Sequence, residues 1–269
     1  MADYVLAFGL VVAIAALLFG AWRAVRGPAP TRGWRALRLA VSVAVAVALT
    51  ATGLYTLMNS RTVQLAGGFL RRVETPEKVV ALTFDDGPTP AYAREVLEIL
   101  RSRGIRATFF VTGREASEAP ADLTAIVEAG HQVGNHSWSH RRLVFLPADT
   151  VAEEFDRTDA LIRAAGYRGP ILVRTPNGKR LLTTPLYLAA SGRTNVFWDS
   201  EPDSDPGVDA AGIRRIVLSD VRPGSIVLMH VMYDSRAPSR EALPLVIDAL
   251  IARGYRFVTL DELQASARE

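Results

Sequence analysis

Two stretches near the N-terminus contain no charged side chain, and they constrain the fold more than any other feature of the chain. They are residues 4–22 and residues 39–60, which are 19 and 22 residues long. A helix rises about 1.5 Å per residue, so each stretch can cross a hydrocarbon core of about 30 Å. The alternating run at 41–48 would also suit a strand, but it lies inside an uncharged stretch longer than strands of soluble folds. We predict two transmembrane helices.

Residues 23–38, between the two stretches, hold five arginines and no acid. By the positive-inside rule this loop faces the cytoplasm, so both ends of the predicted hairpin lie outside. We therefore predict a membrane anchor at 1–60, a linker at 61–76 and an extracytoplasmic domain at 77–269. A cleaved signal peptide is the alternative for the first stretch, but Met-Ala-Asp supplies no basic residue before it and no small-x-small site follows it.

Composition excludes several kinds of chemistry. Cysteine is absent, which excludes disulfides, thiolate metal ligands and a cysteine nucleophile. The net charge of +3 arises from the N-terminal arginines, and acidic and basic side chains nearly balance over the rest of the chain. No basic footprint for nucleic acid is therefore expected.

Beyond residue 77 the sequence alternates between apolar, β-branched runs and amphipathic runs. The predicted strands are 78–84, 107–113, 131–135, 171–176, 194–200, 225–230 and 256–260. The predicted helices are 92–103, 121–130, 148–165, 184–191, 209–221 and 241–253. Seven strands that alternate with helices predict an α/β fold with a mostly parallel sheet, open or closed into a barrel.

Polar side chains gather where the predicted strands end. Asp85, Asp86, Arg174, Asp199 and His230 lie at or just beyond the C-terminal ends of strands, and His136 follows the third strand. Parallel α/β folds build their sites at that rim. The clustering predicts a site there.

Three of the four histidines lie in GHQVGNHSWSH at 130–140. His136 and His140 are four residues apart, so a helical turn would place both rings on one side. Two histidines and one carboxylate are the ligand set of a catalytic zinc that keeps a position for water. Two surface histidines are the alternative. His131 has no partner at a useful spacing, and we expect it to be structural.

The adjacent acids Asp85 and Asp86 have a matching explanation. Asp86 could supply the carboxylate ligand and Asp85 a general base, because a divalent cation offsets the repulsion between them. An ordinary Asp-Gly turn after a strand is the alternative.

Four motifs together resemble one family. TFDDGP (83–88), NHSWSH (135–140), RTPNG (174–178) and LMH (228–230) are similar, in order and spacing, to the polysaccharide deacetylase family, the NodB-homology domain of carbohydrate esterase family 4. The resemblance covers roughly residues 77–265. It implies a distorted (β/α) barrel with fewer than eight strands, consistent with about seven here.

The resemblance also implies roles for individual residues. Asp86, His136 and His140 would hold a divalent metal, usually zinc. Asp85 would be the base, Arg174 would orient it, and His230 would be the acid that protonates the leaving amine. The substrate would contact the backbone N–H of Asn177, with Leu228 and Trp198 as further contacts.

The chain departs from the family pattern at three places. Asn177 stands where the family usually has Tyr, and Val231 stands where it commonly has Asp. No second Trp follows Trp198, where the family has Asp-Trp. Asp203 and Asp205 both remain candidates to support His230, and we expect Asp205.

Three functions follow from these residues. The first is metal-dependent removal of N-acetyl groups from amino sugars of cell-wall or extracellular polysaccharide. The second is a deacylase or deformylase of a lipid-linked sugar, which the membrane anchor would favour. The third is a non-catalytic glycan-binding relative, which the complete set of proposed catalytic side chains disfavours.

Overall fold

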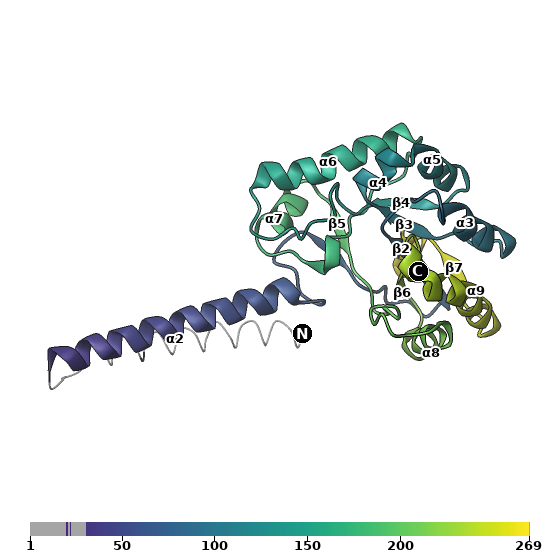
Figure 1. Cartoon of the computed structure of the whole chain (residues 1–269). Coiled ribbons are helices and arrows are strands. Elements are labelled where there is room, and N and C mark those ends of the chain that lie inside the picture. Colours follow the sequence, from purple (N-terminus) through teal and green to yellow (C-terminus); the bar gives the residue numbers. More distant parts are fainter. Residues whose placement is uncertain (1–19, 21, 23–30, 269) are drawn as a thin grey trace. The chain divides into compact units, whose positions relative to one another are not determined.

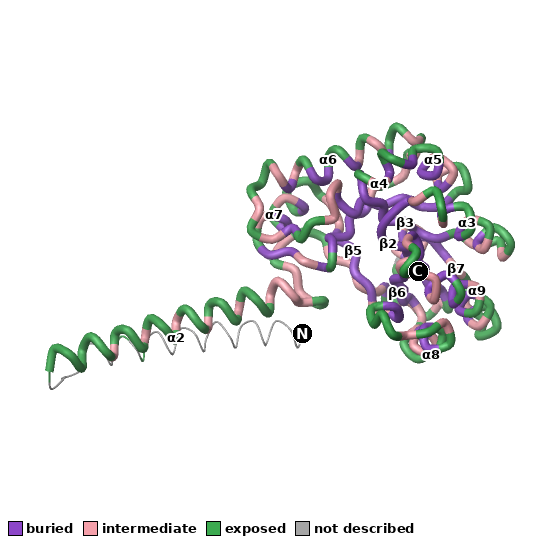
Figure 2. The backbone as a smooth tube through the Cα atoms, in the orientation of Figure 1, coloured by how far each residue is buried: buried purple, intermediate pink, exposed green. Residues whose placement is uncertain are grey.

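The computed structural model describes residues 20, 22 and 31–268, which divide into two units, Met1–Gln64 and Leu65–Glu269. In the first unit, α2 (Arg32–Asn59) has no buried residue (Figure 2) and is apolar and long enough to cross a membrane. The predicted span 4–22 lies outside the described residues, apart from Gly20 and Trp22.

Helix α2 begins seven residues before the predicted span. The Thr31 side chain accepts a hydrogen bond from Trp34 N and caps the helix there. Arg32, Arg35 and Arg38 therefore belong to the helix, and the prediction of a loop through residue 38 is wrong. A two-helix hairpin is not shown.

Strand β1 (Gly68–Leu70) lies within the stretch predicted as a linker. It pairs in parallel with β5 (Thr194–Val196), and Val73 N donates to Gly224 O at 3.0 Å. The second unit thus begins near Leu65. Residues 60–64 alone connect it to α2.

The main sheet is parallel, with strand order β4-β3-β2-β6. Its strands are β2 (Val79–Asp85), β3 (Thr108–Val111), β4 (Gln132–Asn135) and β6 (Ser225–His230). Strand β7 (Arg256–Val258) also pairs with the first half of β2, and β3 pairs with its second half. Strand β2 is therefore the centre of the sheet.

Both faces of β2 are buried, as expected for a strand with no alternation of polar side chains. Val80, Leu82 and Phe84 point to one face and pack against the helices, whereas Val79 and Ala81 point to a second cluster on the opposite face. Because side chains alternate along a strand, Asp85 points to the same face as Val79 and Ala81.

Helices surround the strands (Figure 1). They are α3 (Ala93–Ser102), α4 (Gly113–Glu118), α5 (Pro120–Glu128), α6 (Ala148–Ala164), α7 (Thr183–Ala190), α8 (Ala210–Asp220), α9 (Ala237–Ala252) and α10 (Leu260–Ala265). The six predicted helices correspond to α3, α5, α6, α7, α8 and α9. The sequence analysis missed α4 and α10, each of which has only six residues.

Residues 171–176 were predicted as a strand, but they form no strand in the structure. Val173 makes single parallel bridges, to Asn135 on one side and Asn195 on the other. Pro170 and Pro176 flank the run and lack N–H groups, so the ladder cannot extend. The chain still lies where a strand between β4 and β5 would lie.

Gly224 offers a test of how the start of the second unit is held. Its φ is +79°, and an added Cβ would lie 1.8 Å from Val73 O. We expect Gly224→Ala to destabilise the protein by about 4 kcal/mol. The new Cβ would force the backbone at Val73 to move, and alanine is also strained at a positive φ. Gly104→Ala, with φ +62° and open space, is the matched control and should cost about 1 kcal/mol. Denaturant unfolding of the full-length protein measures both, and equal losses would contradict this account.

Candidate active site

The register of the sheet brings two predicted site residues together. In the β2–β6 ladder Asp85 is the partner of His230, and in the β2–β3 ladder it is the partner of Phe110. Both Asp85 and His230 are the last residues of their strands. The carboxyl ends of parallel strands thus form the floor of the site.

The chain turns sharply after Asp85. Asp86 has φ 74° and Gly87 has φ 71°, and Asp86 N donates to Phe110 O at 3.1 Å. In the second motif Ser137 and His140 also have positive φ, at 67° and 57°. Non-glycine residues in this region are uncommon and cluster at functional sites. These turns aim the neighbouring side chains at one point.

His136 has a fixed tautomer. Its Nδ1 lies 2.8 Å from Arg174 O, and a carbonyl oxygen can only accept a hydrogen bond. Nδ1 therefore carries the proton, and Nε2 presents its lone pair toward two carboxylates, 3.5 Å from Asp85 Oδ2 and 3.9 Å from Asp86 Oδ1. Burial lowers the pKa of His136, outweighing the opposite effect of Asp85, which keeps the ring neutral as a ligand requires.

Asp86, His136 and His140 form a candidate metal centre. Their ligand atoms lie within 4.8 Å of one another, and Asp86 Oδ1 is 3.9 Å from His136 Nε2 and 3.3 Å from His140 Nε2. Ligand atoms around a tetrahedral zinc are roughly 3.4 Å apart. Asp86 Oδ1 is also buried and makes no hydrogen bond with any described residue. A bound cation would supply the partner that this oxygen lacks, so these residues fit a small divalent metal.

Arg174 holds Asp85 in place. Its Nη1 donates to Asp85 Oδ1 at 2.7 Å and to Thr83 Oγ1 at 2.9 Å, and the whole Arg174 side chain is buried. Burial by itself raises the pKa of the Asp85 carboxyl, but Arg174 and His136 outweigh it and hold that pKa below its ordinary value. Asp85 is therefore ionised and oriented.

His230 is paired with Asp203 and not with Asp205. Asp203 Oδ1 lies 3.1 Å from His230 Nδ1, and Oδ2 accepts from His230 N at 2.7 Å. The register explains this pairing. Ser200 forms a parallel bridge with Val227, and three residues further along each segment Asp203 lies opposite His230. Asp205 instead accepts from Gly207 N, so the preference for Asp205 was wrong.

The Asp203 pair changes the proton affinity of His230. Burial by itself lowers the pKa of His230, but the hydrogen bond and charge of Asp203 outweigh it and raise that pKa to about 9. The ring is therefore protonated at neutral pH, with Nε2–H available to a ligand.

Asp199 does not belong to this site. Its carboxylate accepts from Ser225 Oγ and Ile226 N, both at 2.8 Å, which lie at the opposite end of β6 from His230. The grouping of Asp199 with the rim residues was therefore wrong. The predicted strand 194–200 ends at Val196, and the following segment runs beside β6 toward Asp203.

The predicted substrate contacts differ in exposure. Asn177 is exposed, with φ 54°, and its side chain lies 3.4 Å from Arg142 Nε. Leu228 and Trp198 are 1% and 5% exposed and belong to the cluster beneath the site. A ligand would not reach them in this structure, and Trp198 instead lies 5.4 Å from the Arg174 guanidinium. His131 accepts from Ala107 N and is structural, as expected.

Glu115 is a supporting residue that the sequence analysis missed. Its Oε2 accepts from Gly87 N at 2.7 Å and from Thr112 Oγ1, and its Oε1 accepts from Tyr233 Oη at 2.6 Å. Burial and then the charge of Asp86 raise the pKa of Tyr233, so this hydroxyl stays a donor near the site. Glu115 thereby ties the turn after Asp86 to the loop after β6. Because Glu115 lies on the missed α4, no motif pointed to it.

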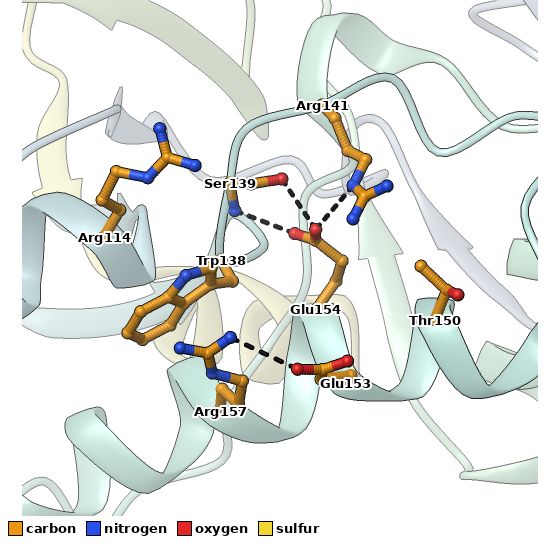
Figure 3. Close-up of a pocket in the computed structure, with 8 residues that line it drawn as sticks. All are labelled: Arg114, Trp138, Ser139, Arg141, Thr150, Glu153, Glu154 and Arg157. Atoms are coloured by element: carbon orange, nitrogen blue, oxygen red, sulfur yellow. Dashed lines mark hydrogen bonds and ion pairs between the residues drawn. The ribbon is translucent and has the colours of Figure 1, made fainter.

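Glu154 supports the other half of the centre (Figure 3). It is 4% exposed and accepts from Ser139 N, Ser139 Oγ and Arg141 Nε at 2.7–2.8 Å. Asn135 Oδ1 accepts from Ser137 N at 2.8 Å. These acceptors fix the loop between the two ligand histidines. Asn135 lies within the motif NHSWSH and could have been found from it. Glu154 lies on α6, outside every motif, and nothing in its local sequence indicates this role.

Comparison with known proteins identifies the family. A family model described as polysaccharide deacetylase matches residues 72–196. The peptidoglycan-N-acetylglucosamine deacetylase of Bacillus cereus is 33% identical over 192 residues, which covers 71% of this chain and 70% of that protein. The chain belongs to the polysaccharide deacetylase family. The resemblance drawn from the four motifs is thereby confirmed.

Solved structures of this family show the same fold. The Bc1960 peptidoglycan N-acetylglucosamine deacetylase superposes with a TM-score of 0.69 at 29% identity, covering 72% of this chain and 92% of that chain. BA3943 of Bacillus anthracis, described as a CE4 family pseudoenzyme, superposes with a TM-score of 0.67 at 27% identity, covering 74% of this chain and 70% of that chain. Membership of the polysaccharide deacetylase family therefore fixes the α/β fold but not activity, which depends on the residues of the site.

The His230–Asp203 pair predicts a pH dependence. A folded-state pKa near 9 lies above the ordinary value of 6.5, so the pair stabilises the fold fully below about pH 6.5, and this contribution is lost as the pH rises through about 9. In Asp203→Asn burial is opposed only by the smaller effects of the Asp85 and Asp86 charges, and we expect the pKa of His230 to fall. NMR titration of the ring measures both values, with Asp205→Asn as the control. An unchanged titration in Asp203→Asn would contradict the assignment.

Glu115 predicts an effect on metal affinity. Glu115→Ala leaves Gly87 N, Thr112 and Tyr233 without their acceptor, so we expect the Kd for zinc to rise about 10–100-fold, the usual cost of losing a partner behind a ligand. Glu115→Gln keeps one acceptor oxygen and should lose less. Glu118→Ala, an exposed change on the same helix, is the control. Competition with a chromogenic chelator measures Kd, and wild-type affinity in Glu115→Ala would refute the role.

Proposed function

We propose that this chain is a metal-dependent N-deacetylase that acts on N-acetylated amino sugars of cell-wall or extracellular polysaccharide. The observation that carries the proposal is the convergence of an ionised Asp85, a protonated His230 and the Asp86–His136–His140 group at one end of the sheet. The relatives named as peptidoglycan N-acetylglucosamine deacetylases support the substrate class.

Amide hydrolysis needs a base on one side of the carbonyl and an acid on the other. Asp85, held by Arg174, accepts the proton of the attacking water. His230, kept protonated by Asp203, donates a proton to the leaving nitrogen, which would otherwise depart as an unstable amide anion. The backbone N–H of Asn177 lies on the exposed rim and serves the developing oxyanion.

Asp86, His136 and His140 hold the metal, which we take to be zinc because two imidazoles and one carboxylate suit it. A divalent metal in this position polarises the amide carbonyl and makes water more acidic. Arg174 also supports these three residues, because its backbone carbonyl accepts a hydrogen bond from His136 Nδ1 and so fixes the tautomer of that ring.

The finer architecture is part of the same proposal. The parallel bridges of Val173 to Asn135 and Asn195, and of Ser200 to Val227, support closure of the strands into a distorted (β/α) barrel. Helix α2 supports an anchor in the membrane, with the catalytic domain outside it. The domain itself then begins near Leu65.

One observation favours a second candidate, a deacylase of a lipid-linked sugar. With β1 inside the predicted linker, the free connection shrinks to residues 60–64, which extend to at most about 18 Å. An anchored enzyme with so short a connection works on substrates near the bilayer. Lipid-linked sugars are held at the bilayer surface, whereas wall polymer extends away from it.

The test is acetate release by the full-length protein with added zinc, from N-acetylglucosamine oligomers and from peptidoglycan. We expect release by the wild type and a loss of about 10³-fold in Asp85→Asn, because general-base catalysis contributes about 10²–10⁴-fold. Zinc content, measured by mass spectrometry, should stay unchanged in the variant.

Other outcomes separate the alternatives. Equal release by wild type and Asp85→Asn would overturn the catalytic assignment. Bound zinc without release from either glycan would direct the test to an N-acylated lipid-linked sugar. The absence of bound metal in the wild type would overturn the metal site.

A further inference from the structure

Large apolar side chains that are exposed gather in one part of the second unit. Among the described residues of that unit they are Leu65, Phe145, Leu182, Leu186, Leu245 and Ile251. Leu245 and Ile251 lie on α9, whereas the other four lie on α7 or on segments that contact it. Single exposed apolar side chains are ordinary, but a group of them marks an interaction surface.

Helix α7 exposes an apolar stripe (Figure 2). Leu182 is its N-cap residue, and Leu186 N donates to Leu182 O at 3.2 Å. The exposed positions are Leu182, Leu186, Ala189 and Ala190, which at spacings of four, seven and eight residues share one side of the helix. The opposite side, with Leu188, is buried. A helix that faces water normally carries polar residues on its outer side, so this stripe suits an apolar partner.

Phe145 extends the surface beyond α7. It is 77% exposed, and its φ is 55°. A positive φ is strained for a bulky side chain, and such residues cluster at functional sites. Leu143 forms a parallel bridge with Arg180, and Leu143 O accepts from Thr184 Oγ1 at 2.9 Å. Phe145 and Leu182 are each two residues further along these parallel segments, so the phenylalanine adjoins the stripe.

The chain enters the second unit against α7. Gly67 has φ 82°, and a Cβ added there would lie 3.0 Å from Ala189 N and 3.4 Å from Pro185 O. Residues 60–67 are the eight residues that follow α2, and they extend to at most about 29 Å. With α2 in the membrane, as proposed, the covalent chain keeps this part of α7 close to the bilayer surface.

The charges beside the stripe suit a bilayer that contains anionic lipid. Residues 139–148 and 160–198 contain no Asp or Glu. Arg142 is exposed and forms no ion pair within the described part of the chain. Asp156, which lies on α6, is engaged by a hydrogen bond from Tyr187 Oη at 2.8 Å. Basic side chains near a membrane surface attract anionic headgroups.

We propose that the α7 patch, which comprises Phe145 and the exposed stripe of α7, docks the catalytic domain onto the bilayer. Its apolar side chains enter the boundary between headgroups and acyl chains, and Arg142 lies among the headgroups. The inference rests on the membrane anchor of the proposed function and goes beyond it. Helix α2 only tethers the domain, whereas the α7 patch holds it in one orientation.

The test is the depth of spin labels in the membrane, and the absence of cysteine makes single-site labelling direct. Leu182→Cys and Leu186→Cys place a nitroxide on the α7 patch, and Leu245→Cys, at an exposed leucine of α9, is the matched control. The full-length protein is reconstituted in vesicles of phosphatidylethanolamine and phosphatidylglycerol. Collisions of the label with oxygen and with a water-soluble nickel chelate give its depth. We expect the patch labels about 5–10 Å inside the interface and the control label in water.

Two further variants separate the apolar contact from the charge. Leu186→Glu should move the Leu182→Cys label out of the lipid, because a carboxylate resists burial in the bilayer. Ile251→Glu, on α9, should leave that label where it is. Arg142→Gln should reduce the depth in vesicles with phosphatidylglycerol and have no effect in phosphatidylcholine alone. All these positions are exposed, so the fold should be retained.

A label at Val45→Cys, within α2, distinguishes failure of this inference from failure of the anchor. Lipid contact at Val45 with water contact at Leu182 and Leu186 would overturn the inference alone. Water contact at all three positions would overturn the anchor and the inference with it. Dipolar broadening between Leu186→Cys labels would assign the α7 patch to a second copy of the chain and would also overturn the inference. Failure of the proposed chemistry would appear separately, as the absence of acetate release.

Discussion

The buried pair of Arg174 and Asp85 is the interaction on which the site depends. The guanidinium has no exposed surface, and its nitrogens reach Thr83 and Asp85 on β2 as well as the carbonyls of Val196, at the end of β5, and of Phe197. Burying two charges is costly unless each is paired and hydrogen-bonded, and here both conditions are met. Loss of the arginine would leave an uncompensated carboxylate and two unpaired carbonyls in the interior.

Arg174 also links Asp85 to the candidate metal centre. The Arg174 carbonyl accepts from His136 Nδ1, while its side chain holds Asp85. Asp85, the proposed base, and His136, a candidate ligand, therefore share one support and cannot shift independently. Glu115 and Glu154 extend this arrangement outward, because each accepts hydrogen bonds from a turn with positive φ beside another candidate ligand, Asp86 or His140. Preorganisation of this kind is what a hydrolytic site requires.

Family membership leaves open whether a given chain is active, as the pseudoenzyme BA3943 illustrates. In this chain Asp203 supplies the negative charge that keeps His230 protonated. The departures at Asn177 and Val231 do not disturb that pair.

The sequence by itself determined the alternation of strands and helices and the two adjacent acids at a strand end. It also determined the histidine pair, because these are local patterns of hydrophobicity and spacing. The tertiary structure alone decided which residues meet across elements. Asp203 rather than Asp205 reaches His230 because the segment after β5 runs in register with β6. Strand β1 forms within the stretch predicted as a linker, since pairing with β5 supplies its hydrogen bonds. Glu115 and Glu154 act through long-range contacts, and such contacts leave no periodic trace in the chain.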